Sequence, residues 1–328
     1  MSPLRVACIG TGFIAGRHLR ALAGFDDVQV VAVADAVPER AADTAAAHGA
    51  RAYDSGVDLL EQEELDAVWI CVPPFAHGPL ELAAIERRLP FLVEKPLAND
   101  LDTALQIAER LETSGLLAAV GYHWRYLSVV EQAAALLAAS PPVLINGYWL
   151  DATPPVPWWV RRERSGGQVL EQTTHLFDLA RLLVGEVDRV EAVEVAAPED
   201  GAVPVAAAAT LHFASGAIGS IASARLLHTR HRVGLQLIAD GCSVELSERS
   251  LVDHELRVVS SEGEQVHQVD EDPIAAEDRA FLDAVATGSA DVRAPYADAL
   301  RSHALAWAAD RSARERTPVV PSELVPHG

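Results

Sequence analysis

A glycine-rich segment near the start of the chain contains residue types that bind phosphate groups. Gly10-Thr11-Gly12 directly follows an apolar run, and Ala15 stands where the third glycine of the dinucleotide-binding fingerprint falls. Gly10 permits a tight turn, Gly12 lets the backbone approach a pyrophosphate, and the next helix offers N–H groups at its N-terminus. A plain strand-to-helix turn has the same pattern. The cofactor contacts predicted here are Gly10, Gly12, Phe13 and Ile14.

A carboxylate at the end of the second apolar run supports a dinucleotide-binding site. Asp35 follows Gly12 by 23 residues, where a carboxylate accepts hydrogen bonds from both ribose hydroxyls of an adenosine. Asp35 would repel a 2′-phosphate, and the next residue is neither arginine nor serine, so the sequence favours NAD over NADP. A helix-capping Asp35 is the alternative. Arg40 is either an adenine contact or a solvated helix residue.

Two more segments carry polar residues directly after apolar runs. Pro73 and Pro74 stiffen a turn that leads to His77, which is either a cofactor contact or a packing residue at the start of a helix. Glu94-Lys95-Pro96 ends the next run, and a buried ammonium is costly without a partner. Over a nicotinamide ring, Lys95 can stabilise a developing alkoxide. A surface lysine paired with Glu94 is the alternative. We expect Pro73, His77, Glu94 and Lys95 to line the cofactor site.

The second half of the chain offers a candidate general base. Glu171 and His175 are four residues apart and Asp178 is three further on, so one helix would place them on one face. Neighbouring carboxylates fix the tautomer of an imidazole and raise its pKa. A ladder of charges on a helix surface is the alternative.

Aromatic residues flank these segments. Trp158, Trp159 and Arg161 precede the His175 segment, and indole rings suit an amphipathic ligand such as a sugar. A buried interface between domains or subunits would use the same residues. His123 follows the last apolar run of the first half and is a further candidate cofactor contact.

Alternating strand and helix patterns position the first group of residues. Until about residue 120, short β-branched runs alternate with helical stretches, which predicts a doubly wound parallel sheet. The expected strands are 4–10, 28–35, 66–73, 90–94 and 116–121. The expected helices are 14–23, 38–48, 77–88 and 100–114.

Strands dominate the second half, which predicts a separate α+β domain on a large, mostly antiparallel sheet. The expected strands are 143–151, 189–197, 205–213, 217–227, 233–239, 243–247 and 251–260, and the expected helices are 128–139, 171–184, 275–287 and 296–314. We therefore expect domains at 1–122 and 123–328. Few helices remain to cover both faces of this sheet, so we expect a homodimer or homotetramer formed through it.

Composition excludes several classes of partner. The formal net charge is −21, which disfavours nucleic acid and anionic membranes. Three cysteines do not suggest a disulfide framework, and the Cys and His spacings match no zinc site, so no metal is expected. We see no signal peptide and no transmembrane run, and expect a cytoplasmic protein.

Together, these motifs resemble one enzyme family. The run GTGFIAGRH, Asp35, PPFAH and EKP are similar to segments of the GFO/IDH/MocA (glucose–fructose oxidoreductase/inositol dehydrogenase) family. Residues 165–178 resemble its G-G-x-x-x-D-x-x-x-H-x-x-D segment, and the ending at 317–320 also fits. The resemblance covers essentially the whole chain.

The resemblance implies a Rossmann domain, an α+β domain and a substrate held over the nicotinamide. Lys95 matches the family's catalytic lysine and His175 its proton-transfer histidine. Glu171 stands at the family's aspartate, which leaves open whether it contacts substrate or orients His175. The implied activity is NAD-dependent hydride transfer to or from a sugar, an inositol or a related polyol. An NAD-dependent glycosidase and a non-catalytic dinucleotide sensor are the alternatives, and the sequence does not select a substrate.

Overall fold

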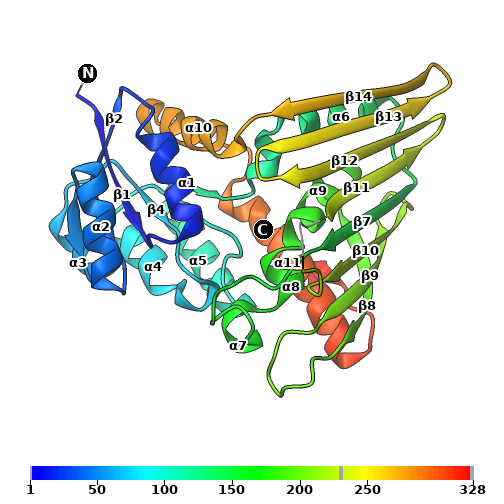
Figure 1. The fold of residues 1–328 in the computed structure, drawn as a ribbon, viewed down its shortest axis with the longest axis horizontal. Coiled ribbons are helices and arrows are strands. Elements are labelled where there is room, and N and C mark those ends of the chain that lie inside the picture. The colour runs from blue at the N-terminus through cyan, green and yellow to red at the C-terminus, as the bar shows by residue number, and fades with distance from the viewer. Residues whose placement is uncertain (1, 229–231, 326–328) are drawn as a thin grey trace. The chain divides into compact units, whose positions relative to one another are not determined.

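The computed structural model describes residues 2–228 and 232–325. The chain divides into two compact units (Figure 1). The first comprises Met1–Ala98, Asp102–His123 and Ile274–Asp298, and the second comprises Asn99–Leu101, Trp124–Pro273 and Ala299–Gly328. Apart from the short segment Asn99–Leu101, the chain passes into the second unit at Trp124. Residues 274–298 belong to the first unit again, so neither unit is a single continuous segment of the sequence.

The first unit is built on a six-stranded sheet in the order β3-β2-β1-β4-β5-β6. Every pair of neighbouring strands runs parallel, which confirms the predicted doubly wound sheet. The candidate cofactor residues follow the carboxyl ends of five of these strands, β1, β2, β4, β5 and β6. The strands are β1 (Leu4–Ile9), β2 (Val28–Ala34), β3 (Arg51–Tyr53), β4 (Ala67–Ile70), β5 (Phe91–Val93) and β6 (Ala118–Val120).

The helices between these strands agree closely with the sequence pattern. They are α1 (Phe13–Leu22), α2 (Pro38–His48), α3 (Gly56–Gln62), α4 (Pro79–Glu86) and α5 (Leu101–Ser114), with 3-10 turns η1 (Pro74–Ala76) and η2 (His123–Tyr126). The expected list lacks β3 and α3. Strand β3 has only three residues and none of them is buried, so it leaves no apolar run in the sequence.

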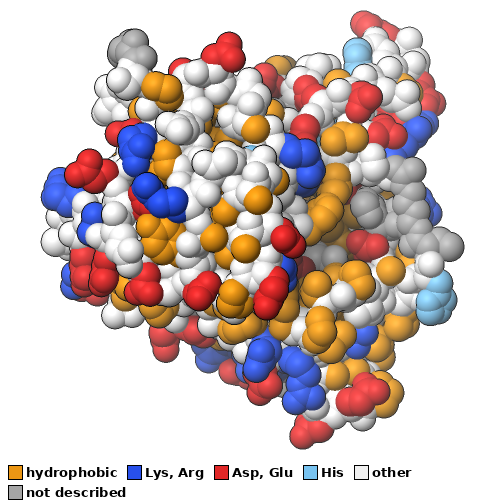
Figure 2. All heavy atoms as spheres, turned by 60° about the vertical axis from the view of Figure 1, so that its left-hand side comes forward, with side chains coloured by type: hydrophobic (Ala, Val, Ile, Leu, Met, Phe, Trp, Pro, Cys, Tyr) orange, Lys and Arg blue, Asp and Glu red, His pale blue; other side chains and the backbone are white. Residues whose placement is uncertain are grey.

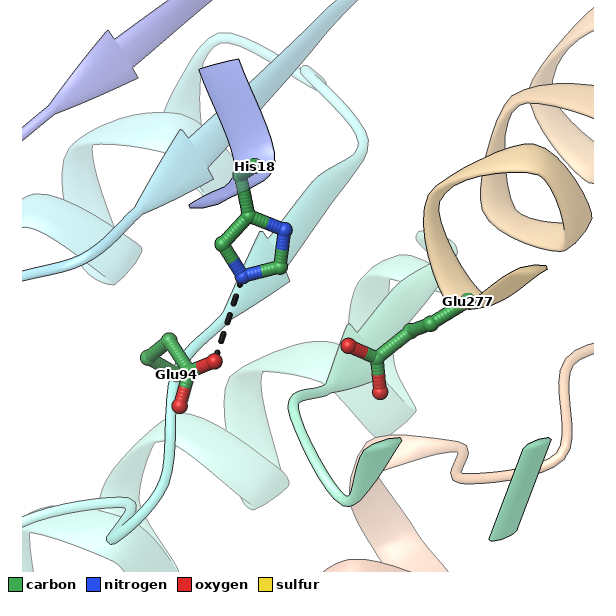
Figure 3. A group of neighbouring side chains, drawn as sticks. All are labelled: His18, Glu94 and Glu277. Carbon is green, nitrogen blue, oxygen red and sulfur yellow. Dashed lines mark hydrogen bonds and ion pairs between the residues drawn. The ribbon is translucent and has the colours of Figure 1, made fainter. Parts of the chain in front are cut away.

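Helix α10 (Pro273–Thr287) supplies the C-terminal contribution to the first unit. Phe281 packs edge-on against Trp69 of β4 with ring centroids 5.2 Å apart, and both side chains are fully buried. One turn earlier, Glu277 points toward the neighbourhood of His18 and Glu94 (Figure 3). A distant part of the chain thereby completes the interior of the Rossmann unit.

The second unit contains an eight-stranded sheet in the order β14-β13-β12-β11-β7-β10-β9-β8. Only β7 and β10 pair in parallel, so the mostly antiparallel sheet is confirmed. The strands are β7 (Leu144–Leu150), β8 (Val187–Val195), β9 (Ala206–Phe213), β10 (Ile218–Ala224), β11 (Arg232–Ala239), β12 (Cys242–Ser250), β13 (Asp253–Ser260) and β14 (Gly263–Asp270). Strand β14 is absent from the expected list because it is an almost fully exposed edge strand.

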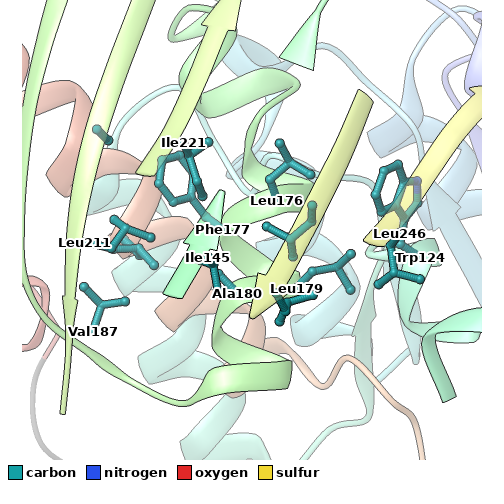
Figure 4. Close-up of a cluster of buried hydrophobic side chains, with 14 of the residues drawn as sticks. Trp124, Ile145, Leu176, Phe177, Leu179, Ala180, Val187, Leu211, Ile221 and Leu246 are labelled. Carbon is teal, nitrogen blue, oxygen red and sulfur yellow. The ribbon is translucent and has the colours of Figure 1, made fainter. Parts of the chain in front are cut away.

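One face of this sheet carries the core of the second unit. Phe177, Leu179 and Ala180 pack with apolar residues of β7 to β13 (Figure 4). The helices of this unit are α6 (Ser128–Ala139), α7 (Arg162–Ser165), α8 (Gln168–Glu171), α9 (Thr174–Val184) and α11 (Tyr296–Glu315), with the 3-10 turn η3 (Pro321–Glu323). Helix α11 begins in the first unit and contributes to this core from Leu305 onward.

The opposite face exposes apolar side chains. Strand alternation directs them away from the helices, and they are Val193, Val195, Ile218, Val259 and Val266. Elsewhere the surface is mixed. On the face shown in Figure 2, the described Lys and Arg side chains lie scattered among acidic ones and form no broad basic patch. Within 2–228 and 232–325, no helix has the length and apolar character required to span a membrane.

The expected single helix over 171–184 is wrong at its start. Helix α8 ends at Glu171, a turn follows at Gln172 and Thr173, and α9 begins at Thr174. The backbone N–H of Thr173 bonds back to the carbonyl of Gln168, which closes α8. Glu171 and His175 therefore do not share the face of one continuous helix.

Candidate active site

The glycine-rich turn has the geometry of a phosphate site. Gly10 has a φ of +90°, and a Cβ there would stand 2.2 Å from the carbonyl oxygen of Cys71, so this turn requires glycine. At Gly12, no described atom outside this residue and its two chain neighbours lies within 4 Å of the place a Cβ would take. The N-terminus of α1 begins at the next residue without a side-chain cap, so its N–H groups suit a pyrophosphate. Phe13 is 73% exposed and Ile14 is half-buried.

Asp35 ties the second strand to this turn. Its Oδ2 accepts hydrogen bonds from the backbone N–H of Thr11 at 2.9 Å and from its hydroxyl at 2.7 Å. Its Oδ1 accepts from Val37 N at 2.9 Å and Arg40 Nη2 at 2.7 Å. Burial raises the pKa of Asp35, but these bonds outweigh it and leave that pKa below its usual value. An ionised carboxylate therefore stands beside the turn, with a cation next to it.

His77 is anchored through one ring nitrogen. It is 5% exposed, and its Nδ1 lies 2.6 Å from Oε1 of Glu81, whose Oε2 accepts from the N–H of Gly78. This is the packing role that the sequence offered as one alternative. The Nε2 atom has no hydrogen-bond partner among the described residues, so a contact with the cofactor stays open. Pro73 is half-buried beside it.

Lys95 follows β5 and is half-buried, whereas Glu94 before it is only 2% exposed. The peptide bond between Lys95 and Pro96 is cis. The full sequence adds a signal that the motif alone does not carry. The chain uses 25 arginines and a single lysine, and that lysine is Lys95. An ammonium is a compact, titratable charge, unlike the planar guanidinium.

In the second unit, His175 is held by aromatic rings. It is 3% exposed and stacks at 6.0 Å on Trp124 and at 5.9 Å on Trp149, with interplanar angles of 17° to each. Asp178, which the sequence offered as a carboxylate beside His175, is bonded to Arg125 and Ser302. It accepts hydrogen bonds from Arg125 at 2.8 and 2.5 Å and from the hydroxyl of Ser302 at 2.5 Å.

Glu171 and the tryptophans before it form a second group. The indole Nε1 of Trp159 donates a 2.6 Å hydrogen bond to Oε2 of Glu171. Trp159 is 1% exposed, so in this structure its ring supports the carboxylate and offers no face to a sugar. Trp158 is half-buried. Arg161 is exposed, with its guanidinium 3.8 Å from Glu163. His123 starts η2 and is 6% exposed.

Comparison with known proteins agrees with these features. Residues 4–122 match the model of an oxidoreductase family with an NAD-binding Rossmann fold, and residues 141–264 match the model of the GFO/IDH/MocA C-terminal domain. An inositol 2-dehydrogenase of Rubrobacter xylanophilus is 31% identical over 74% of this chain and 71% of its own length. A myo-inositol 2-dehydrogenase of Thermotoga maritima is 28% identical over 68% of this chain and 69% of its own.

Solved structures share the whole fold. A levoglucosan dehydrogenase in complex with NADH and levoglucosan superposes with a TM-score of 0.87 and 22% identity, over 99% of this chain and 100% of that one. An Agrobacterium radiobacter oxidoreductase in complex with NAD+, L-tartaric acid and magnesium gives a TM-score of 0.85 at 19% identity, over 99% and 100%. At such identities, these structures establish the fold.

Proposed function

Because this chain belongs to the GFO/IDH/MocA family of oxidoreductases, we propose that it transfers a hydride between NAD(H) and a carbinol or carbonyl carbon of a sugar, an inositol or a related polyol. The chain is an NAD-dependent oxidoreductase that acts on CH–OH groups. The residues around the Gly10 turn fit the cofactor, because an open glycine, an uncapped helix N-terminus and an ionised Asp35 face the same turn. The bound nicotinamide supplies the hydride acceptor or donor.

The observation that carries the proposal is the placement of the only lysine. Lys95 stands at the carboxyl end of β5, beside the buried Glu94. In the oxidative direction, its ammonium hydrogen-bonds the substrate hydroxyl and stabilises negative charge as that hydroxyl loses its proton. The carboxyl ends of strands in such sheets are where ligands bind, which supports this role.

His175 accepts the hydroxyl proton in the same proposal. Its ring packs beside two indoles whose own centroids lie 6.2 Å apart, and this aromatic cluster holds the orientation of the imidazole. We assign Glu171, held by Trp159, to orienting His175 or binding a substrate hydroxyl. Trp158, Arg161, Pro73, His77 and His123 remain proposed contacts of substrate or cofactor.

The proposal includes assembly and location. We propose a homodimer or homotetramer formed through the exposed face of the eight-stranded sheet, because exposed apolar side chains of β8, β10, β13 and β14 share that face. We propose the cytoplasm as the location, since the free thiols of Cys8, Cys71 and Cys242 suit a reducing compartment.

A substrate screen with two lysine variants tests the activity. Purified protein is incubated with NAD and a panel of inositols, aldoses and anhydrosugars, and nicotinamide absorbance is followed. We expect Lys95→Ala to lower kcat by about 10²- to 10³-fold while NAD still binds, as for loss of one oxyanion donor. Lys95→Arg is the matched variant, because arginine serves at all other basic positions of the chain. It keeps the charge and should also lose most of kcat.

Two results would contradict the proposal. If no member of the panel reduces NAD, but an aryl glycoside is hydrolysed without added NAD, the chain is a glycosidase. If Lys95→Arg or Lys95→Ala folds, binds NAD and turns over within a few-fold of the parent, Lys95 is not catalytic.

A further inference from the structure

A chain of buried polar contacts leads from helix α10 to the backbone of Lys95. Oδ1 of Asp278 lies 2.7 Å from Nδ1 of His18, and Nε2 of the same ring lies 3.1 Å from Oε1 of Glu94. The other oxygen of Glu94, Oε2, accepts a 3.0 Å hydrogen bond from the backbone N–H of Lys95. His18 and Asp278 are fully buried and Glu94 nearly so. These contacts all lie within the first unit.

His18 lies between the carboxyl groups of Asp278 and Glu94, one at each ring nitrogen. An ionised carboxylate only accepts hydrogen bonds, so with both groups ionised both nitrogens of His18 donate. Burial raises the pKa of Asp278, and its bonds with His18 and Trp69 oppose that rise. Burial lowers the pKa of His18, but Asp278 and Glu94 together raise it well above its usual value. Trp69 Nε1 also donates to Oδ1 of Asp278 at 2.8 Å, which fixes the position of the Asp278 carboxylate at the end of this series of contacts.

The local fold makes room for this arrangement. A Cβ on Gly121, directly after β6, would stand 2.7 Å from Oε1 and from the carboxyl carbon of Glu94. Any larger residue at this position would therefore push the Glu94 carboxylate out of place. The Glu94 carboxylate accepts a hydrogen bond from the backbone N–H of Lys95, so the position of Glu94 determines the position of the Lys95 backbone.

We infer that His18 and Asp278 are positioning residues for Lys95, acting through the Glu94 carboxylate that holds the Lys95 backbone. This inference rests on the proposed function for its effect on catalysis, but not for its effect on Lys95 itself. Misplacing a catalytic group by about 1 Å is enough to lower a rate by about 10²-fold. The residues therefore support the reaction without touching substrate or cofactor.

A metal ion is the competing interpretation of this cluster. One ligand atom each from His18, Glu94 and Glu277 lies within 4.8 Å of the others (Figure 3). However, Nε2 of His18 already bonds to Glu94, and a metal there would replace that bond. Burial raises the pKa of Glu277 well above its usual value, which favours the neutral form of this side chain, and a neutral carboxyl group is a poor metal ligand. Metal bound to the purified protein is an outcome that the test must exclude.

Two substitutions of His18 separate positioning from simple burial. The amide nitrogen of glutamine stands near the place of Nε2, so His18→Gln keeps a donor toward Glu94. The amide of asparagine stands near Nδ1, so His18→Asn keeps only the contact with Asp278. Both remove the same ring and the same charge. We expect His18→Asn to lower kcat on the order of 10- to 100-fold with little change in KM, and His18→Gln to lower it clearly less.

A second measurement needs neither substrate nor cofactor. Because the chain has one lysine, reductive methylation with ¹³C-formaldehyde labels only Lys95 and the N-terminal amine. We expect one sharp lysine resonance in the parent, a similar one in His18→Gln, and a displaced or split one in His18→Asn. Glu277→Gln is the control, because it changes a buried side chain of the cluster that makes no bond in the chain of contacts.

The outcomes are distinct. If the Lys95 resonance is the same in the parent and both His18 variants, or if the two variants lose kcat equally, the inference is wrong. If the parent shows no activity but the resonance pattern holds, the proposed function fails and the positioning stands. If the His18 variants do not fold, Gly121→Ala and Asp278→Asn carry the same test, and an unshifted resonance in both overturns the inference. Stoichiometric zinc or manganese by elemental analysis would also overturn it.

Discussion

The guanidinium of Arg40 lies 2.7 Å from Oδ1 of Asp35, the carboxylate that ends β2. The sequence presented Asp35 without a neighbouring cation, yet α2 brings one into contact with it. Arg40 is more than half exposed, so solvent screens this pair and it adds little to stability. Its significance lies in cofactor choice, since a carboxylate favours NAD and a guanidinium accommodates a 2′-phosphate.

Removing the Asp35 carboxylate should reverse the preference between cofactors. We expect the parent to bind NAD at least about 10-fold tighter than NADP, or about 1.4 kcal/mol. In Asp35→Ser, Arg40 loses its carboxylate partner and becomes available to a phosphate, so NADP should bind as tightly as NAD or tighter. Arg40→Ala in that background should abolish the gain. Calorimetric titration of both cofactors measures this, and an unchanged preference in Asp35→Ser would exclude Asp35 from the ribose site.

The bond between Trp159 and Glu171 predicts a coupled pair. Hydrogen bonds to charged groups contribute roughly 1.5–3 kcal/mol, so Trp159→Phe should lower kcat/KM by about 10- to 100-fold if Glu171 serves the reaction. Glu171→Gln should cost about as much, because the amide keeps the shape but loses the charge. In the Glu171→Gln background, Trp159→Phe should have little further effect. Additive losses would show that Trp159 acts independently of Glu171, for example in packing.

The sequence predicted long, strongly patterned elements well. Helix α2 begins and ends where its proline and following glycine indicate, because those residues fix helix termini by backbone geometry. Strand β14 was missed, since its exposed polar residues carry no apolar periodicity. The break before His175 was missed for a different reason. Its closing bond is between backbone atoms of Gln168 and Thr173, which no side-chain pattern records.

The candidate site shows the same limit. Lys95 and Glu94 could be named from the sequence because a charged pair after an apolar run is unusual. The residues that hold Glu94 in place could not be named in this way. His18 and Asp278 stand 260 residues apart in the sequence and meet only when α10 packs within the first unit. A simple count would have strengthened the assignment of Lys95, because it is the only lysine in an arginine-rich chain.

The exposed face of the eight-stranded sheet predicts self-association. Val193 and Val195 are 66% and 59% exposed on β8, and water contact with such a face is unfavourable. We expect a dimer or tetramer by light scattering at micromolar concentration. Replacing both valines with glutamate should shift the mass toward the monomer. Leu136→Glu is the matched control and should leave the mass unchanged, because Leu136 is exposed on α6, a helix that packs into the core of the unit. A monomeric parent would exclude this interface.

The buried carboxyl group of Glu277 predicts a pH-dependent effect on stability. Burial raises its pKa in the folded state, so above its unfolded pKa of about 4.3 the folded protein binds more protons than the unfolded one. The free energy of unfolding therefore falls as the pH rises from the unfolded-state pKa of Glu277 toward its folded-state pKa. Glu277→Gln removes this contribution. The Tm of the variant relative to the parent should therefore increase as the pH rises above about 4.3. A constant difference across this range would show that Glu277 is not protonated in the folded state.

Substitution of His175 gives the most direct test of the proposed proton transfer. His175→Ala should lower kcat by about 10²- to 10⁴-fold, as expected for loss of a general base. The remaining rate should increase with pH, because solvent hydroxide then accepts the proton. If Lys95 and His175 act on the same hydroxyl, the double variant with Lys95→Ala should lose less than the product of the two single losses. Circular dichroism and NAD titration on each variant establish that fold and cofactor binding persist. A fully multiplicative loss, or a residual rate that does not respond to pH, would place His175 outside the proton-transfer step.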